Sequence, residues 1–296
     1  MIKLDMTRVL TPVDFTEISA AAIDHAASMV RISKGELLLL YVQRKKSLSG
    51  ALRAASGLKL SESEPVNYQV LLEKTAAEIS KRYGIKVKTI LSSGMRVQQI
   101  VKTAEKERVG LIVMGTRGSS SNSSLLLGSN SHRVVSDSGV PVLTVRNGIA
   151  KPAYKHILLP VDSSEHTRQK VQVAMQMAKL YNASIRVLGM LDDKEADYRG
   201  KLEVILHQVT AKIKENHISV SSEVILTGNA AGSTILRASQ EQADLIIAMT
   251  DQHTAKSSLL ARSYDHQLVD ESDIAVLSVP PEIHLENIES VSFGGL

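Results

Sequence analysis

Short apolar runs alternate with amphipathic segments along almost the whole chain. Runs such as residues 37–40 contain no polar position, which is typical of parallel strands that are buried on both faces of a sheet. The segments between the runs repeat apolar residues every three or four positions, as helices that cover a sheet do. The pattern therefore predicts an α/β fold in which strands and helices alternate.

The pattern places five strands and four helices in each half of the chain. Strands are predicted at 7–13, 36–42, 86–92, 110–115 and 141–146, and helices at 17–33, 63–83, 96–107 and 129–138. In the second half, strands are predicted at 155–161, 183–190, 219–226, 243–249 and 274–279, and helices at 164–181, 195–216, 231–242 and 258–270.

The two halves are copies of one unit. Residues 8–15 align with residues 156–163 at an offset of 148, whereas residues 140–145 align with residues 274–279 at an offset of 134. The extra residues of the first copy are expected in the polar stretch 43–66. A repeat of about 140 residues is too long for a solenoid unit, so it indicates two tandem domains.

We place the domain boundaries at 1–148 and 153–281, with a short, turn-rich junction between the two domains. A C-terminal tail follows at 282–296, and its polar and apolar residues alternate. Two interpretations of the tail stay open. It adds a strand to an edge or docks on a partner chain, or it frays as chain ends commonly do.

Composition narrows the class of protein. Of the 296 residues, 43% are hydrophobic and 22% are charged, as in ordinary globular proteins. The sequence has neither a membrane-spanning run nor the apolar core of a signal peptide, and it contains no cysteine. We therefore expect a cytoplasmic protein without disulfides or thiol chemistry.

The content of aromatic residues and the spacing of the histidines argue against nucleic acid and metal ions as partners. Aromatic residues make up 3% of the chain and tryptophan is absent, so we expect no nucleic-acid partner. The nine histidines lack the spacing of a metal site, and no metal ligand is assigned.

Charge divides unevenly between the two copies. The first 150 residues contain 21 Lys and Arg against 12 Asp and Glu, whereas the remainder contains 14 against 19. A basic first copy favours an anionic ligand. Ordinary surface variation between two domains is the alternative explanation.

A glycine-rich stretch follows the fourth predicted strand. Gly115 and Gly118 are separated by two residues, and Gly128 and Ser129 come nine residues after Gly118, at the start of a predicted helix. Glycines let the backbone approach a ligand closely, and free N–H groups at a helix start attract anions. Neither a Walker motif nor a GxGxxG motif is present. The stretch therefore predicts a phosphate-binding loop.

This spacing resembles the G-x2-G-x9-G-[ST] loop of the ATP-binding branch of the universal stress protein family. The resemblance implies two open five-stranded sheets of order 3-2-1-4-5 with helices on both faces, as in the adenine nucleotide alpha hydrolase-like folds. It implies ATP, ADP or AMP as the ligand, with Mg²⁺ as an optional companion. It further implies that the fifth strands of the two copies pair within the chain, and association into a homodimer stays open.

Ligands of open α/β sheets bind beyond the carboxyl ends of the strands, where the strand order reverses. Here that point lies between Asp14 and Gly115. Asp14 is expected to accept hydrogen bonds from a ribose hydroxyl or a base N–H, and capping of the following helix is the alternative. By the same resemblance, Val42 matches the family position that packs on adenine, with strand core as its alternative. Met114 matches a family residue beside the base and is expected to serve as both core and pocket wall.

The helix start and the loop supply the remaining candidates. Ser129 and Ser131 lie in the first helical turn, where hydroxyl and N–H groups meet phosphate. Arg117 approaches a phosphate or is solvated, and residues 119–124 form a polar lid or a phosphorylated segment. The predicted nucleotide-binding residues are Pro12, Val13, Asp14, Val42, Met114, Gly115, Arg117, Gly118, Gly128, Ser129 and Ser131.

The second copy lacks the loop. At the offset of 134, the three glycines are replaced by Met249, Gln252 and Arg262, whose side chains obstruct a close approach of phosphate. We therefore predict a nucleotide-binding regulatory protein of the stress response, with the nucleotide in the first copy and no catalytic residue assigned. A slow ATPase or autophosphorylating protein, and a nucleotide-independent scaffold, are the alternatives.

Overall fold

The computed structural model describes residues 4–43, 67–116, 130–146, 154–162, 169–192, 197–250 and 263–281. The strands of the first half are β1 (Arg8–Pro12), β2 (Glu36–Gln43), β3 (Lys86–Ser93), β4 (Leu111–Gly115) and β5 (Val142–Val145). Its helices are α1 (Glu17–Ser33), α3 (Tyr68–Tyr83), α4 (Arg96–Lys106) and α5 (Asn130–Asp137).

The second half repeats this series. Its strands are β6 (His156–Val161), β7 (Ser184–Leu191), β8 (Val220–Leu226), β9 (Leu245–Met249) and β10 (Ala275–Val279). Its helices are α6 (Gln169–Tyr181), α7 (Arg199–Glu215), α8 (Ala230–Gln240) and α9 (Tyr264–Glu271).

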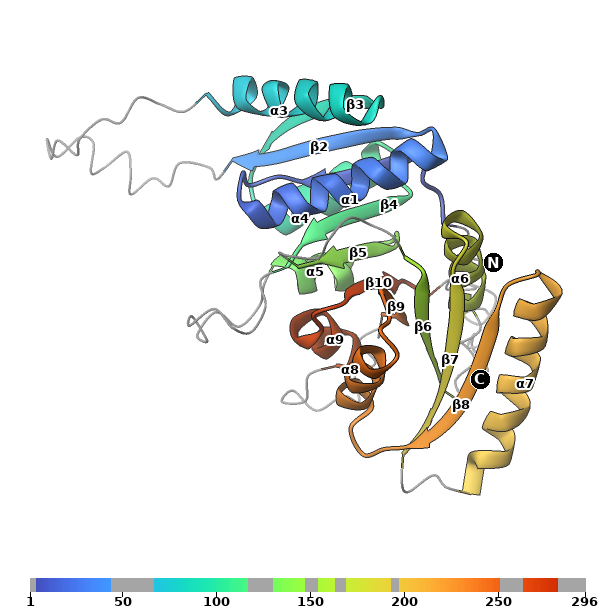
Figure 1. The fold of residues 1–296 in the computed structure, drawn as a ribbon. Helices are drawn as coiled ribbons and strands as arrows, with labels where there is room; N and C mark the ends of the chain where they lie inside the picture. Colours follow the sequence, from blue (N-terminus) through green and yellow to red (C-terminus); the bar gives the residue numbers. More distant parts are fainter. Residues whose placement is uncertain are drawn as a thin grey trace, which may run out of the picture.

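All of these strands belong to one sheet, in the order β3-β2-β1-β4-β5-β10-β9-β6-β7-β8 (Figure 1). Within each half the neighbouring strands run parallel, and each half has the predicted order 3-2-1-4-5. The predicted α/β fold is confirmed, and each strand ends within two residues of its predicted limits. The strands of the second half cross those of the first steeply in Figure 1, as an accumulating sheet twist requires.

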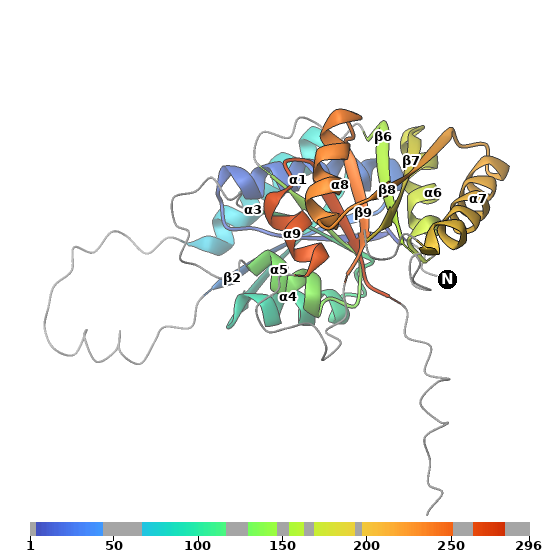
Figure 2. The ribbon, with the colours of Figure 1, turned by 90° about the horizontal axis from the view of Figure 1, so that it is seen from below.

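The helices form two layers, one on each face of the sheet (Figure 2). The layer of α1, α3, α6 and α7 covers one hydrophobic cluster, and the layer of α4, α5, α8 and α9 covers the other. Alternate residues of one strand enter opposite clusters. Leu37 and Leu39 face the α1 side, whereas Leu38 and Leu40 face the α4 side. This burial on both faces explains why the strands are continuous apolar runs.

One helix start differs from the prediction, and others lie outside the described residues and cannot be compared. The predicted helix 195–216 begins at Arg199, because a short 3-10 turn precedes it at 197–198. The first residues of the predicted helices 63–83, 164–181 and 258–270 lie outside the described residues. The change of offset lies between β2 and β3, because β7 starts 148 residues after β2, whereas β8 starts 134 residues after β3. The predicted stretch 43–66 falls almost entirely outside the described residues.

The two halves join through their fifth strands, as predicted. β5 pairs with β10 in antiparallel register, with Leu143 opposite Leu277. These two leucines are also equivalent to each other in the repeat, at the offset of 134. A pseudo-two-fold axis therefore passes between them, in the isologous arrangement of a symmetric dimer.

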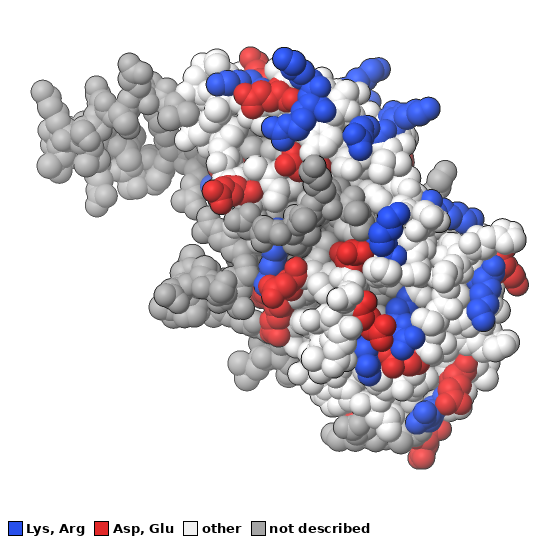
Figure 3. All heavy atoms as spheres, viewed as in Figure 1, with Lys and Arg blue, Asp and Glu red and all other residues white. Residues whose placement is uncertain are grey.

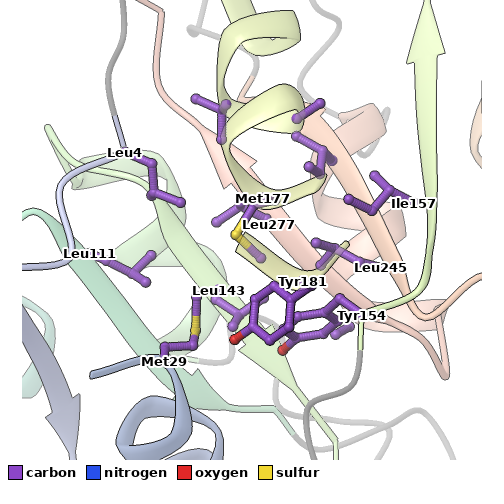
Figure 4. Close-up of a cluster of buried hydrophobic side chains, with 14 of the residues drawn as sticks. Leu4, Met29, Leu111, Leu143, Tyr154, Ile157, Met177, Tyr181, Leu245 and Leu277 are labelled. Carbon is purple, nitrogen blue, oxygen red and sulfur yellow. The ribbon is translucent and has the colours of Figure 1, made fainter. Parts of the chain in front are cut away.

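Large side chains fill the junction on the α1 side of the sheet (Figure 4). Met29 of α1 and Met177 of α6 belong to the same buried cluster as Tyr154, which lies two residues before the start of β6. The Tyr154 ring packs edge-on against Tyr181 at 5.0 Å between ring centres, and its hydroxyl bonds to Nδ1 of His25 at 2.8 Å. Both clusters contain residues of both halves, so each of the two cores is shared between the halves.

Among the described residues, no helix combines the length and the apolar character that a membrane crossing requires.

Truncation of either leucine on the pseudo-two-fold axis tests this shared core. Leu143 and Leu277 are both fully buried. We expect Leu143→Ala and Leu277→Ala each to lower the free energy of unfolding by about 2–5 kcal/mol, the usual cost of a cavity of this size. Urea denaturation should show similar losses for the two variants and a single transition. Two separate transitions would show that the halves unfold independently.

Candidate functional site

The carboxyl ends of β1 and β4 lie next to each other in the first half. Val9 pairs with Leu111 and Leu10 pairs with Ile112, so the chain leaves both strands at one edge of the sheet. The strand order reverses at this point, since β1 leads outward to β2 and β4 leads to β5. The structure therefore brings the predicted residues that follow β1 and those that end β4 to one place.

Asp14 lies in a tight connection between β1 and α1. The N-cap of α1 is Thr16, whose Oγ1 accepts a hydrogen bond from the Ser19 amide at 3.3 Å. Oδ1 of Asp14 accepts from the Thr16 amide at 3.1 Å and from its hydroxyl at 2.6 Å. The alternative prediction, that Asp14 caps the helix, is thus corrected: the exposed carboxylate orients the capping threonine and is not itself the cap.

Phe15 gives this connection its shape. Its φ of 62° is in the left-handed region, which a bulky side chain rarely adopts. Its ring lies 5.3 Å from the Tyr41 ring and 6.2 Å from the Tyr68 ring, and the two tyrosines stack on each other at 4.4 Å. This aromatic cluster of Phe15, Tyr41 and Tyr68 holds the strained residue beside Asp14, and residues that sustain such strain are often functional.

The aromatic cluster was not predicted, because its members come from three segments that are distant in the sequence. The one available signal was a tyrosine at the end of an otherwise aliphatic strand, next to Val42. Burial, and then the hydrogen bond with Tyr68, raise the pKa of Tyr41 to about 12. The positive charge of Arg96, at the start of α4, opposes this rise.

Val42 and Met114 lie on the opposite face of the sheet from Tyr41. Their exposed fractions are 7% and 6%, and both belong to the cluster beneath α4 and α5. Val13 is equally buried, and its amide donates to the Leu40 carbonyl at 2.8 Å, whereas Pro12 is half-buried. These side chains are thus strand core, and only their edges can meet a ligand beyond the sheet.

Gly115 has a packing requirement of its own. A Cβ at this position would lie 2.4 Å from Cγ2 of Ile18 and 2.8 Å from its carbonyl oxygen. The glycine therefore lets the first turn of α1 pack directly on the end of β4. Its counterpart in the repeat, Met249, has a half-buried side chain that packs against the core.

Of the residues predicted to contact phosphate at the helix start, the structure describes Ser131. It lies in the first turn of α5 and is 3% exposed. Arg117, Gly118, Gly128 and Ser129 lie outside the described residues, and so do residues 119–124.

Part of the basic character of the first half lies away from this edge. On the face shown in Figure 3, many Lys and Arg side chains gather over α3 and the start of β3, at the amino ends of the strands. At the carboxyl edge, Arg96 lies close enough to influence Tyr41 electrostatically.

The second half has a different arrangement at its own carboxyl edge. Asp265 of α9 is equivalent to Ser131 and is 1% exposed. Its Oδ1 accepts from the Ser263 hydroxyl at 2.6 Å and from the His266 amide at 2.9 Å, while Oδ2 is buried without a partner among the described residues. A carboxylate thus occupies the first turn of α9, where the helix dipole favours negative charge.

Other side chains at the carboxyl edge of the second half also form contacts within the chain. Met190 is equivalent to Val42, and its sulfur accepts a hydrogen bond from the buried Thr234 hydroxyl at 3.2 Å. The same hydroxyl lies 3.0 Å from the Tyr264 hydroxyl. Contacts within the chain therefore surround the position that corresponds to Val42.

The molecule is therefore a tandem of two open α/β units that are fused through their fifth strands, with a glycine-ended β4 at the switch point of the first unit. The sequence profile of the universal stress protein family matches residues 6–146 and 153–280, and the chain belongs to this family.

Individual relatives agree with this assignment. Universal stress protein MJ0577 of Methanocaldococcus jannaschii is 32% identical over 152 residues, which cover 47% of this chain and 94% of that protein. Universal stress protein MJ0531 of the same organism is 30% identical over 139 residues, covering 47% and 81%. Each relative thus matches about half of the chain.

One solved structure matches nearly the whole chain. The crystal structure of a universal stress protein from Archaeoglobus fulgidus superposes with a TM-score of 0.72 and 22% identity, and the match covers 93% of this chain and 99% of that one. At this identity the likeness shows the fold alone. It extends over both halves of the chain.

Alanine at Gly115 tests the packing of α1 on β4. We expect Gly115→Ala to lower the free energy of unfolding by about 1–3 kcal/mol, because the added methyl overlaps Ile18. Gly139→Ala is the matched control, since a Cβ there meets nothing within 4 Å. Urea denaturation compares the two variants, and equal stability would contradict the close approach.

Ionisation of Tyr41 tests the aromatic cluster. The pKa of Tyr41 rises from 10.0 to about 12 in the folded chain, so the unfolded chain ionises first. The stability that this group contributes is therefore complete below pH 10 and is lost as the pH rises toward 12. Subtracting the tyrosinate absorbance titration of Tyr41→Phe from that of the wild type should reveal one late-titrating phenol. A difference titration curve centred near pH 10 would contradict the burial of Tyr41 in the aromatic cluster.

Proposed function

We propose that the first half binds an adenine nucleotide, ATP or its relatives ADP and AMP, and that the protein is a nucleotide-dependent regulator of the universal stress response. One observation carries this proposal. The glycine motif that begins at Gly115 follows a strand that ends beside Asp14, at the switch point of an open α/β sheet. Ligands of such sheets bind at that point.

The described residues supply the chemistry that a nucleotide needs. Asp14 is an exposed carboxylate that can accept hydrogen bonds from ribose hydroxyls. Ser131 lies in the first turn of α5, the helix that follows β4 in the chain, and a helix start favours phosphate through its dipole. Val42 and Met114 offer apolar edges to the base. A Mg²⁺ ion that accompanies ATP would be held mainly by the phosphates, as is usual for this cation.

The second half is not proposed to bind nucleotide. Asp265 places a buried carboxylate where Ser131 of the first half is proposed to meet phosphate, and two anions at one helix start repel each other. Met249 adds a side chain where the first half has Gly115. Together with Gln252 and Arg262, these residues restrict the proposed site to the domain at 1–148.

We assign the domain at 153–281 to a structural role in the cytoplasmic protein. The regulatory output would be a surface that differs between the free and the nucleotide-bound chain and that a partner protein reads. A nucleotide shifts such an equilibrium by its difference in affinity for the two states.

Calorimetric titration of nucleotide-stripped protein with ATP, ADP and AMP tests the proposal. We expect binding by the wild type. Gly118→Gln and Gly128→Arg, which introduce the residues of the second half, should weaken binding about tenfold or more, because bulky side chains obstruct the phosphates. Asp14→Asn should weaken binding to a smaller extent.

The matched controls are Gln252→Ala and Arg262→Ala at the equivalent positions of the second half, and both should bind like the wild type. Wild-type protein that binds none of the three nucleotides at millimolar concentration would overturn the proposal. Equal loss of binding in the second-half variants would overturn its restriction to the first half.

A further inference from the structure

We propose that the contact between α5 and α9 couples nucleotide occupancy in the first half to the packing of the second half against it. This inference rests on the proposed function, and it concerns the regulation of the same site. α5 carries Ser131 at its start, and the same helix packs against α9 across the pseudo-two-fold axis.

Two polar contacts join these helices. Nε2 of His132 bonds to Oδ1 of Asp270, and Nε2 of His266 lies 2.8 Å from the Ser136 hydroxyl. The two histidine rings meet edge to face, with 4.9 Å between their centres. His132 is equivalent to His266, and Ser136 is equivalent to Asp270. The pseudo-two-fold axis therefore relates the two contacts, but the partner of the histidine is a carboxylate in one and a hydroxyl in the other.

Asp270 anchors His132 to α9. His132 is 7% exposed, and its Nδ1 is buried without a partner in the described part of the chain, so the bond to Asp270 is its described polar anchor. Asp270 is itself held, because its carbonyl accepts from Arg146, which also pairs with Asp273 at 2.5 Å. Arg146 follows β5, so these contacts tie α9 back to the strand junction.

Helix α5 is short, with 8 residues or about two turns. Ser131 and His132 are adjacent in its first turn, and Ser136 lies one turn later. Both contacts with α9 therefore hold the helix start at which phosphate is proposed to bind.

The coupling is reciprocal by thermodynamic necessity. A helix start that α9 holds in place needs no further ordering when phosphate binds, so the intact contact raises affinity. Loss of the contact in the second half must then weaken nucleotide binding in the first. The α1 side of the junction offers a comparison, since its bond between His25 and Tyr154 also crosses between the halves but involves neither α5 nor α9.

The test measures nucleotide dissociation constants of full-length variants. Asp270→Ala removes the acceptor of His132 and should raise Kd about fivefold or more. Asp270→Asn keeps an oxygen acceptor and should stay within about twofold of the wild type. Ser136→Ala breaks the second contact with a minimal change in volume and should raise Kd in the same direction, which keeps the test valid should Asp270→Ala not fold.

Tyr154→Phe is the matched control, because it deletes a buried bond between the halves on the other face. It should lower stability in urea and leave Kd unchanged. Unchanged Kd in Asp270→Ala and Ser136→Ala, with a binding wild type, would overturn this inference alone. An equal rise of Kd in Tyr154→Phe would overturn it as well, by showing a general loss of stability. A wild type that binds no nucleotide would overturn the proposed function and this inference together.

Discussion

The antiparallel pairing of β5 with β10 is the constraint on which the rest of the molecule depends. It places Leu143 opposite Leu277, converts two five-stranded sheets into one, and removes an exposed edge from each half. On each face of the sheet, the two halves then contribute side chains to a common core. A change in either half is therefore felt at the junction.

Duplication leaves the geometry of equivalent positions similar and allows their chemistry to diverge. The same type of contact occurs twice between α5 and α9. His132 bonds to the carboxylate of Asp270, and His266 bonds to the hydroxyl of Ser136. At the carboxyl edges, Ser131 of the first half corresponds to the buried Asp265 of the second. Such divergence allows one half to serve as the proposed site while the other half holds α5 in position.

Much of the fold was accessible from the sequence. Strands such as β2 are buried on both faces, so their apolar runs are unmistakable, and their limits follow from the polar turns that flank them. The strand order came from the resemblance that the loop at Gly115 indicated. The sequence also predicted that Asp14 and Gly115 lie at one edge of the sheet. It did not reveal that the close approach of Ile18 leaves no room for a Cβ at Gly115, or that Thr16 is the N-cap of α1.

Local pattern thus determined the elements, the repeat and the candidate phosphate loop, since periodicity and glycine spacing depend on neighbouring residues alone. Tertiary structure alone decided the aromatic cluster around Phe15, the buried carboxylate of Asp265 and the contact of His132 with Asp270. Each of these joins side chains from segments that only the folded sheet brings together, or depends on burial that the completed core imposes. No local pattern encodes such distances, so they emerge only when the chain has packed.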